Sequence, residues 1–229
     1  MTIAPILVTG FEPYGGHGRN PAFEAMRALD GRIIERVPIR GRGLPVSMTR
    51  LRPALAALFD EAEFAAIIGL GLQPGASVIQ IERNASNLAD FEIADNDGLS
   101  FRDASVSANG PAARLATLPL RAIERALLAA GIPARLSASA GTFLCNACLY
   151  CCLEAVEARP RPPLCGFLHL PCLPEQVAET ALKQERPGAD VASMELSRIV
   201  AGVEIAVRET IRELARSDYE TASKKTALP

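Results

Sequence analysis

The chain has 229 residues, of which 49% are hydrophobic and 22% charged, and its formal net charge is −2. This length and composition fit one large domain with a substantial core. Acidic and basic residues are interspersed, which argues against a basic nucleic-acid footprint and against a polybasic membrane patch. We therefore expect small molecules or copies of the same chain as partners.

The first residues lead directly into an apolar segment, with no basic region and no small-residue cleavage site before it. We interpret this segment as a first strand rather than a signal peptide. No apolar stretch approaches the roughly 18 residues that a membrane span needs. The sequence thus predicts a cytoplasmic protein, in which the six cysteines are reduced.

Strand-like apolar runs alternate with segments of helical period along most of the chain. The expected strands are residues 6–9, 33–37, 65–70, 78–82, 135–139 and 164–169. The expected helices are residues 22–28, 48–59, 120–130, 143–157, 174–183 and 194–216. This alternation predicts a parallel or mixed α/β sheet.

Two segments fall outside this alternation. Residues 85–110 are polar and rich in Asn, Asp and Ser, which predicts an excursion over the sheet edge, and excursions of this length tend to be functional. Residues 218–229 are short and polar, and we expect a disordered tail there. The predicted domain therefore comprises residues 1–217.

Cys145 is the candidate nucleophile. It follows a predicted strand and a glycine turn at Gly141, and it opens an apolar helix. The unpaired N–H groups and the positive dipole end of a helix stabilise a thiolate relative to a thiol. A cysteine in this position is suited to nucleophilic attack.

A thiolate catalyst needs a proton shuttle, and the chain has only two histidines. His169 ends a buried apolar run, at the strand end where parallel sheets bind ligands. His17 lies in a glycine-rich loop, and we interpret it as a surface residue without chemistry.

Glu82 is the candidate carboxylate that orients the histidine, because it ends the alternating run at residues 77–82. Spacing alone leaves a second interpretation open, in which Glu82 is a surface carboxylate paired with Arg83.

The other cysteines and the N-terminal glycines offer two further interpretations that we discount. Cys148, Cys151 and Cys152 share the predicted helix with Cys145, where a helical stripe wraps a metal cluster poorly. We expect them, with Cys165 and Cys172, to be buried core residues, and we expect no metal. The glycines of residues 10–16 match neither a Walker A nor a dinucleotide fingerprint, so we expect no cofactor.

Several ordered motifs resemble those of the pyroglutamyl peptidase I family, also called pyrrolidone-carboxylate peptidases, a family of cysteine peptidases. The resemblance rests on residues 8–16, 20–21, 82–85, 93–98, 110–113, 117–119, 140–146 and 169–176. Ordered blocks along nearly the whole chain are more specific than any single motif.

The resemblance implies a single-domain, three-layer α/β/α sandwich with a mixed, mostly parallel twisted sheet, and a homo-oligomer, either a dimer or a tetramer. It implies a Cys-His-Glu triad, whose positions fall on Cys145, His169 and Glu82. It also implies removal of N-terminal pyroglutamyl (5-oxoproline) residues from small peptides or amides through a thioester.

The substrate pocket follows from the same resemblance. Phe11 and Tyr14 match positions that wall the lactam ring, although both could simply pack their loop onto the sheet. Tyr14 replaces the commoner phenylalanine, and its hydroxyl needs a partner if it is buried. Asn20 and Ile93 are weaker pocket candidates, and backbone N–H groups at Leu144 and Cys145 would form part of an oxyanion hole.

Three positions depart from the usual family pattern. Leu72 stands where a glutamine is usual, and Ala76 and Glu92 stand where arginines are usual. Replacing a cation that stabilises the oxyanion should weaken or redirect catalysis. Two alternatives follow: the same triad with another acyl or amide substrate, or a ligand-binding homologue without catalysis.

Overall fold

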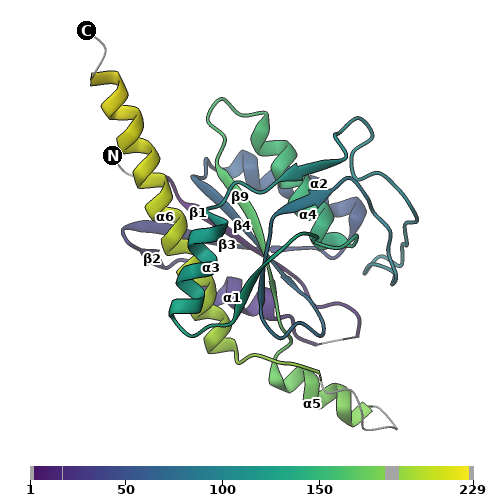
Figure 1. The fold of residues 1–229 in the computed structure, drawn as a ribbon. Coiled ribbons are helices and arrows are strands. Elements are labelled where there is room, and N and C mark those ends of the chain that lie inside the picture. The colour runs from purple at the N-terminus through teal and green to yellow at the C-terminus, as the bar shows by residue number, and fades with distance from the viewer. Residues whose placement is uncertain (1–2, 17, 184–190, 227–229) are drawn as a thin grey trace.

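A seven-stranded sheet forms the centre of the molecule (Figure 1). The computed structural model describes residues 3–16, 18–183 and 191–226, and within them the strand order is β2-β3-β1-β4-β9-β5-β8. The bounds are β1 Ile6–Phe11, β2 Ile33–Ile34, β3 Val37–Leu44, β4 Ala66–Leu72, β5 Ile79–Glu82, β8 Ala134–Ser137 and β9 Leu164–Leu170.

The sheet is mixed and mostly parallel, as the family resemblance implies. Strands β3, β1, β4 and β9 are parallel to one another. Strands β5 and β8 are parallel to each other, but β5 is antiparallel to β9, and β2 is antiparallel to β3. Because β5 is antiparallel to β9, the start of β5 lies beside the end of β9, with Gln80 paired to His169 and Glu82 to Phe167.

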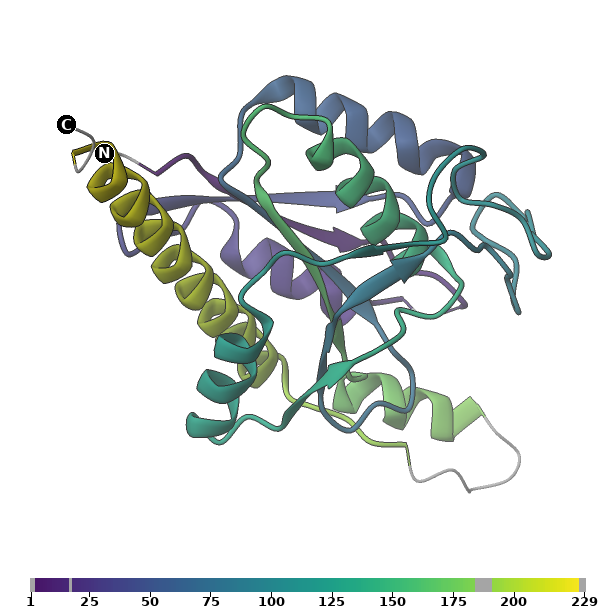
Figure 2. The same ribbon diagram turned by 45° about the horizontal axis from the view of Figure 1, so that its top comes forward.

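Helices cover both faces of this sheet, which confirms the predicted three-layer sandwich. The bounds are α1 Pro21–Leu29, α2 Met48–Glu61, α3 Leu120–Ala129, α4 Leu144–Glu157, α5 Pro174–Lys183 and α6 Leu196–Thr226. Helices α1, α3 and α6 pack on one face and α2 and α4 on the other, each around its own buried apolar cluster. Figure 2 shows the two helical layers on opposite sides of the sheet, with α5 beyond the strand ends.

The sequence missed strand β3. Residues 33–37 form part of a hairpin rather than one strand, because Glu35 and Arg36 both have positive φ angles, 47° and 69°, and turn the chain between β2 and β3. The two glycines of β3, Gly41 and Gly43, lower its predicted strand propensity, but the packing requires them. A Cβ atom on Gly41 would lie 2.7 Å from the Cβ of Asp30, and one on Gly43 would lie 2.7 Å from the ring of Phe23.

The excursion is confirmed as a region without helix, and it is bracketed by a small antiparallel pair that the sequence also missed. This pair joins β6 (Asn84–Ser86) to β7 (Ala113–Leu115). Strands this short carry little periodic signal.

The predicted end of the last helix near residue 216 is wrong, because α6 continues to Thr226. Residues 218–226 contain no glycine or proline to stop a helix. Within the described residues, no helix is both long and apolar enough to cross a membrane.

Candidate active site

Cys145 is the second residue of α4, as the sequence predicts. The chain leaves β8, turns at Gly141 with a φ of 75°, and enters the helix at Leu144. The N-cap residue, Phe143, makes no side-chain capping hydrogen bond. The first turn therefore keeps N–H groups available for a ligand at the end where the helix dipole is positive.

Gly71 of β4 leaves the space that the thiol occupies. A Cβ atom on this residue would lie 2.6 Å from the Sγ atom of Cys145 and 2.8 Å from the ring of Phe167. Carbon and sulfur atoms in contact are normally well over 3 Å apart, so only glycine fits here without displacing the cysteine.

His169 and Glu82 are joined by a buried hydrogen bond of 2.8 Å between Nδ1 and Oε1. The antiparallel register pairs Glu82 with Phe167, two residues from His169 on β9. Side chains two residues apart point to the same face, so the carboxylate and the imidazole are diagonal neighbours. Glu82 is fully buried, which rules out the interpretation of a surface carboxylate.

The charges around His169 favour its protonated form. Burial alone would lower its pKa, but the negative charge and hydrogen bond of Cys145, together with those of Glu82, raise the pKa to about 9. The second oxygen of Glu82, Oε2, is buried and has no hydrogen-bond partner in the described part of the chain. The hydrogen bond to His169 is therefore the one that holds this carboxylate.

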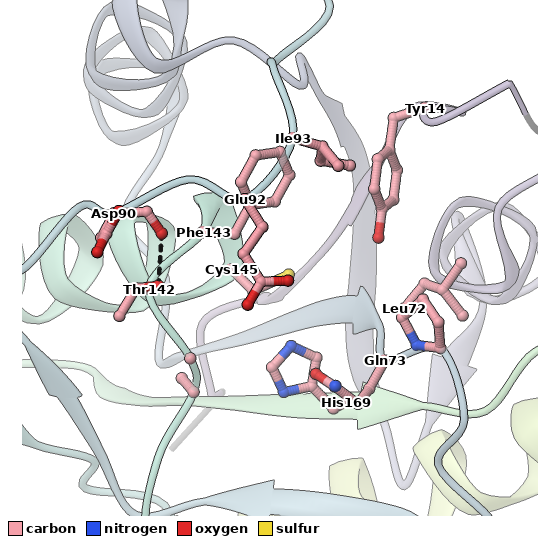
Figure 3. Close-up of a pocket in the computed structure, with 13 residues that line it drawn as sticks. Tyr14, Leu72, Gln73, Asp90, Glu92, Ile93, Thr142, Phe143, Cys145 and His169 are labelled. Carbon is pink, nitrogen blue, oxygen red and sulfur yellow. Dashed lines mark hydrogen bonds between the residues drawn. The ribbon is translucent and has the colours of Figure 1, made fainter. Parts of the chain in front are cut away.

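Cys145 and His169 open onto a cavity of about 280 Å³ (Figure 3). Glu82 does not line this cavity. The lining residues come from the loop after β1, the end of β4, the excursion and the start of α4: Tyr14, Leu72, Gln73, Pro74, Asp90, Glu92, Ile93, Ala140, Gly141, Thr142, Phe143, Cys145 and His169.

A small recess of about 10 Å³ adjoins this cavity, since the two share Tyr14, Leu72, Phe143 and Cys145. The recess is completed by Phe11, Asn20, Val46 and Leu144. All five pocket candidates from the sequence therefore line either the cavity or the recess.

The candidates differ in how they take part. Tyr14 lines both spaces, while Ile93 lines only the cavity and is half exposed. Asn20 is buried and engaged in structure: its Oδ1 accepts from the N–H of Ala22 at 3.0 Å, and its Nδ2 donates to the carbonyl of Glu12 at 3.1 Å.

The sequence missed several residues that shape this cavity. Phe143 lies between two aromatic neighbours, with ring centroids 5.8 Å from Tyr14 and 4.5 Å from Phe91. Thr142 donates from Oγ1 to the carbonyl of Asp90 at 2.6 Å, which ties the excursion to the turn before Cys145. The signal that could have found them is their position in the sequence directly before the candidate nucleophile, Cys145.

Asn146 anchors the excursion from the other side. Its buried amide accepts from the N–H of Ser86 at 2.8 Å and donates to the carbonyls of Ser86 and Leu88, both at 2.9 Å. The residue after the candidate nucleophile thus anchors the segment that carries Glu92 and Ile93 to the cavity.

Two of the three departures from the family pattern lie at the site. Leu72 and Glu92 line the cavity, whereas Ala76 is buried and does not. Cys148, Cys151, Cys152, Cys165 and Cys172 are buried, as expected for core residues. Within the described residues, no cluster of three or more His, Cys, Asp or Glu side chains is arranged to hold a metal ion. His17 lies outside the described residues.

Comparison with known proteins gives the same family as the sequence motifs. The family model described as pyroglutamyl peptidase matches residues 4–213. The pyrrolidone-carboxylate peptidase of Pyrococcus furiosus is 37% identical over 206 residues, which cover 90% of this chain and 99% of that protein. The pyrrolidone-carboxylate peptidase of Pseudomonas fluorescens SBW25 is 41% identical over 203 residues, which cover 88% of this chain and 90% of that protein.

The solved structure of pyrrolidone carboxyl peptidase from Thermococcus litoralis superposes with a TM-score of 0.88 at 37% identity, covering 93% of this chain and 96% of that one. The fold and these relatives define the chain as a cysteine-type peptidase. It belongs to the pyroglutamyl peptidase family.

Proposed function

We propose that this protein removes N-terminal pyroglutamyl residues from small peptides or amides through a thioester intermediate on Cys145. The observation that carries the proposal is the buried Glu82–His169 hydrogen bond behind a cysteine that opens onto the cavity. This is the geometry of an activated nucleophile with an oriented base.

The roles of the three residues follow from acyl transfer. Because Nδ1 of His169 faces Glu82, Nε2 is the nitrogen that exchanges a proton with Cys145. The thiolate attacks the scissile carbonyl, and the imidazolium protonates the amine as the C–N bond breaks. Water then attacks the thioester with His169 as base, which releases pyroglutamate and regenerates the thiol.

The cavity supplies what the lactam ring needs. The ring is small and flat, and the aromatic side chains of Phe11, Tyr14 and Phe143 line the space beside Cys145. A mostly apolar pocket with a few placed polar groups is typical of small-ligand sites. Backbone N–H groups at Leu144 and Cys145 would stabilise the oxyanion of the tetrahedral intermediate.

The test is turnover of a pyroglutamyl amide with a fluorogenic leaving group, under reducing conditions. We expect turnover by the wild-type protein and none by Cys145→Ala, with Cys148→Ala retaining activity as a matched cysteine control. A folded wild-type protein that hydrolyses other acyl amides but no pyroglutamyl amide would contradict the proposal and point to Leu72 and Glu92.

The proposal also covers the domain bounds, the cellular location and the oligomeric state. Residues 1–217 would carry the activity, which is supported by the family match to residues 4–213. The protein would act in the cytoplasm, supported by six free cysteines. It would form a dimer or tetramer, an expectation that rests on the resemblance and that light scattering of the purified protein would test.

A further inference from the structure

The hydroxyl of Tyr14 is a polar group at the site that the mechanism above does not use. Figure 3 shows this hydroxyl pointing into the cavity, on the side of Leu72. Within the described part of the chain, no protein group forms a hydrogen bond with it. The ring is held beside Phe143, at 5.8 Å between centroids. Its position is therefore fixed by packing, while its hydroxyl is free to meet a ligand.

The electrostatic surroundings keep this hydroxyl protonated. Burial and the negative charges of Cys145 and Cys172 raise the pKa of Tyr14 well above its ordinary value. The group is thus a hydrogen-bond donor across the range of pH in which the enzyme would work.

The recess identifies which part of the substrate meets Tyr14. It is lined by Cys145 but not by His169. The leaving amine must lie near His169, which protonates it, so the acyl group lies on the other side of the sulfur. Tyr14 and Leu72 line the recess beside Cys145 as well as the cavity that His169 shares, so they flank the acyl group there.

Other polar side chains of the recess are already engaged. The side-chain amide of Asn20 forms hydrogen bonds with the backbone of Ala22 and Glu12. The neighbouring Leu72 side chain has no polar atom to offer a ligand. A lactam carbonyl placed there without a donor would lose its hydrogen bonds to water.

We propose that the Tyr14 hydroxyl donates a hydrogen bond to the ring carbonyl of the bound pyroglutamyl group, and so acts as a specificity-determining residue. This inference rests on the proposed function. A phenylalanine in this place would supply the same ring contact but not the hydrogen bond.

The test is Tyr14→Phe, assayed on the fluorogenic pyroglutamyl amide. We expect KM to rise about two- to tenfold, the effect of one lost hydrogen bond between neutral groups, with kcat unchanged. Tyr150→Phe is the matched control, because that hydroxyl donates to the carbonyl of Pro111 outside the cavity. It should leave KM unchanged.

A binding readout separates this inference from the proposed function. 2-Pyrrolidone carries the ring and its carbonyl without a scissile bond, and it should protect Cys145 from iodoacetamide. The concentration for half-protection should rise by the same factor in Tyr14→Phe, even if the wild-type protein turned over no amide. Equal KM and equal protection in the two proteins, or no protection of the wild-type protein, would overturn the role of Tyr14.

Discussion

Glu82 shows how one buried residue depends on its surroundings for its chemistry. The sequence placed it at the end of a strand but left two interpretations open. The structure decides between them through the hydrogen bond to His169. Cys145 and His169 could be predicted, since a glycine turn before a helix and a chain with two histidines leave few candidates. The pairing of Glu82 with His169 could not be decided from the sequence, because it depends on the antiparallel register of β5 and β9.

The pH dependence of catalysis should report the charge of Glu82. A pKa of about 9 means that His169 stays protonated up to that pH, so kcat/KM should fall as the pH rises through about 9. Glu82→Gln removes the negative charge, which lowers the pKa of His169 and moves this alkaline limb to lower pH. We also expect kcat/KM at its optimum to drop about 100-fold or more.

The pH profile of kcat/KM measures both effects, with Glu204→Gln as the control. Glu204 is paired with Arg32 and Arg208 on the far side of the sheet from Cys145. An alkaline limb that stays in place in Glu82→Gln would show that Glu82 does not set the charge of His169.

At the scale of elements, helix positions could be predicted well because the apolar period extends over several turns. Strand β3 could not be predicted, because Gly41 and Gly43 weaken the strand pattern. Both glycines are required by the close approach of α1 and of Asp30 at its end. The excursion is similar: its polar composition predicts a loop, but its position is set by single anchors such as Asn146.

Removing the anchor at Asn146 should affect both stability and substrate binding. Asn146→Ala leaves partly buried backbone groups of Ser86 and Leu88 without these partners, which should lower the free energy of unfolding by about 1–3 kcal/mol. KM should rise because Glu92 and Ile93 lose their fixed position. Denaturant unfolding and steady-state kinetics measure the two effects.

Asn87→Ala is the comparison for this variant. Its amide forms hydrogen bonds with Ser107 and Gly110 within the excursion rather than with α4. It should lower stability with a smaller effect on KM. An Asn146→Ala protein with reduced stability and an unchanged KM would show that Asn146 supports the fold alone.

At the scale of the whole molecule, the proposed triad lies where three separate parts of the chain meet on one face of the sheet. β5 supplies Glu82, β9 supplies His169 and the start of α4 supplies Cys145. The alternation of strands and helices predicts the layers, but the order β4-β9-β5 joins segments far apart in the sequence. Sequence reasoning proposed the same three residues as a set, and the family resemblance gave the same positions, but neither gave the strand order that brings them together.

The extension of α6 lies away from this assembly and should be dispensable. The buried face of the helix includes Ile199, Val203, Val207 and Ile211, all before residue 217. A chain ending at residue 217 should therefore fold and keep its kcat/KM, as circular dichroism and kinetics would show. A chain ending at residue 205 removes part of this face and should not fold. Loss of folding on removal of residues 218–229 would contradict this domain boundary.

The most direct test of the central claim is to trap the acyl-enzyme. The wild-type protein would be mixed with the pyroglutamyl amide, quenched in acid within the first turnovers, digested and examined by mass spectrometry. The account predicts a pyroglutamyl thioester on Cys145 and on none of the other cysteines, and no adduct in Cys145→Ala. Full turnover by the Cys145→Ala variant would contradict the assignment of Cys145 as the nucleophile. A thioester on another cysteine of the wild-type protein would contradict it equally.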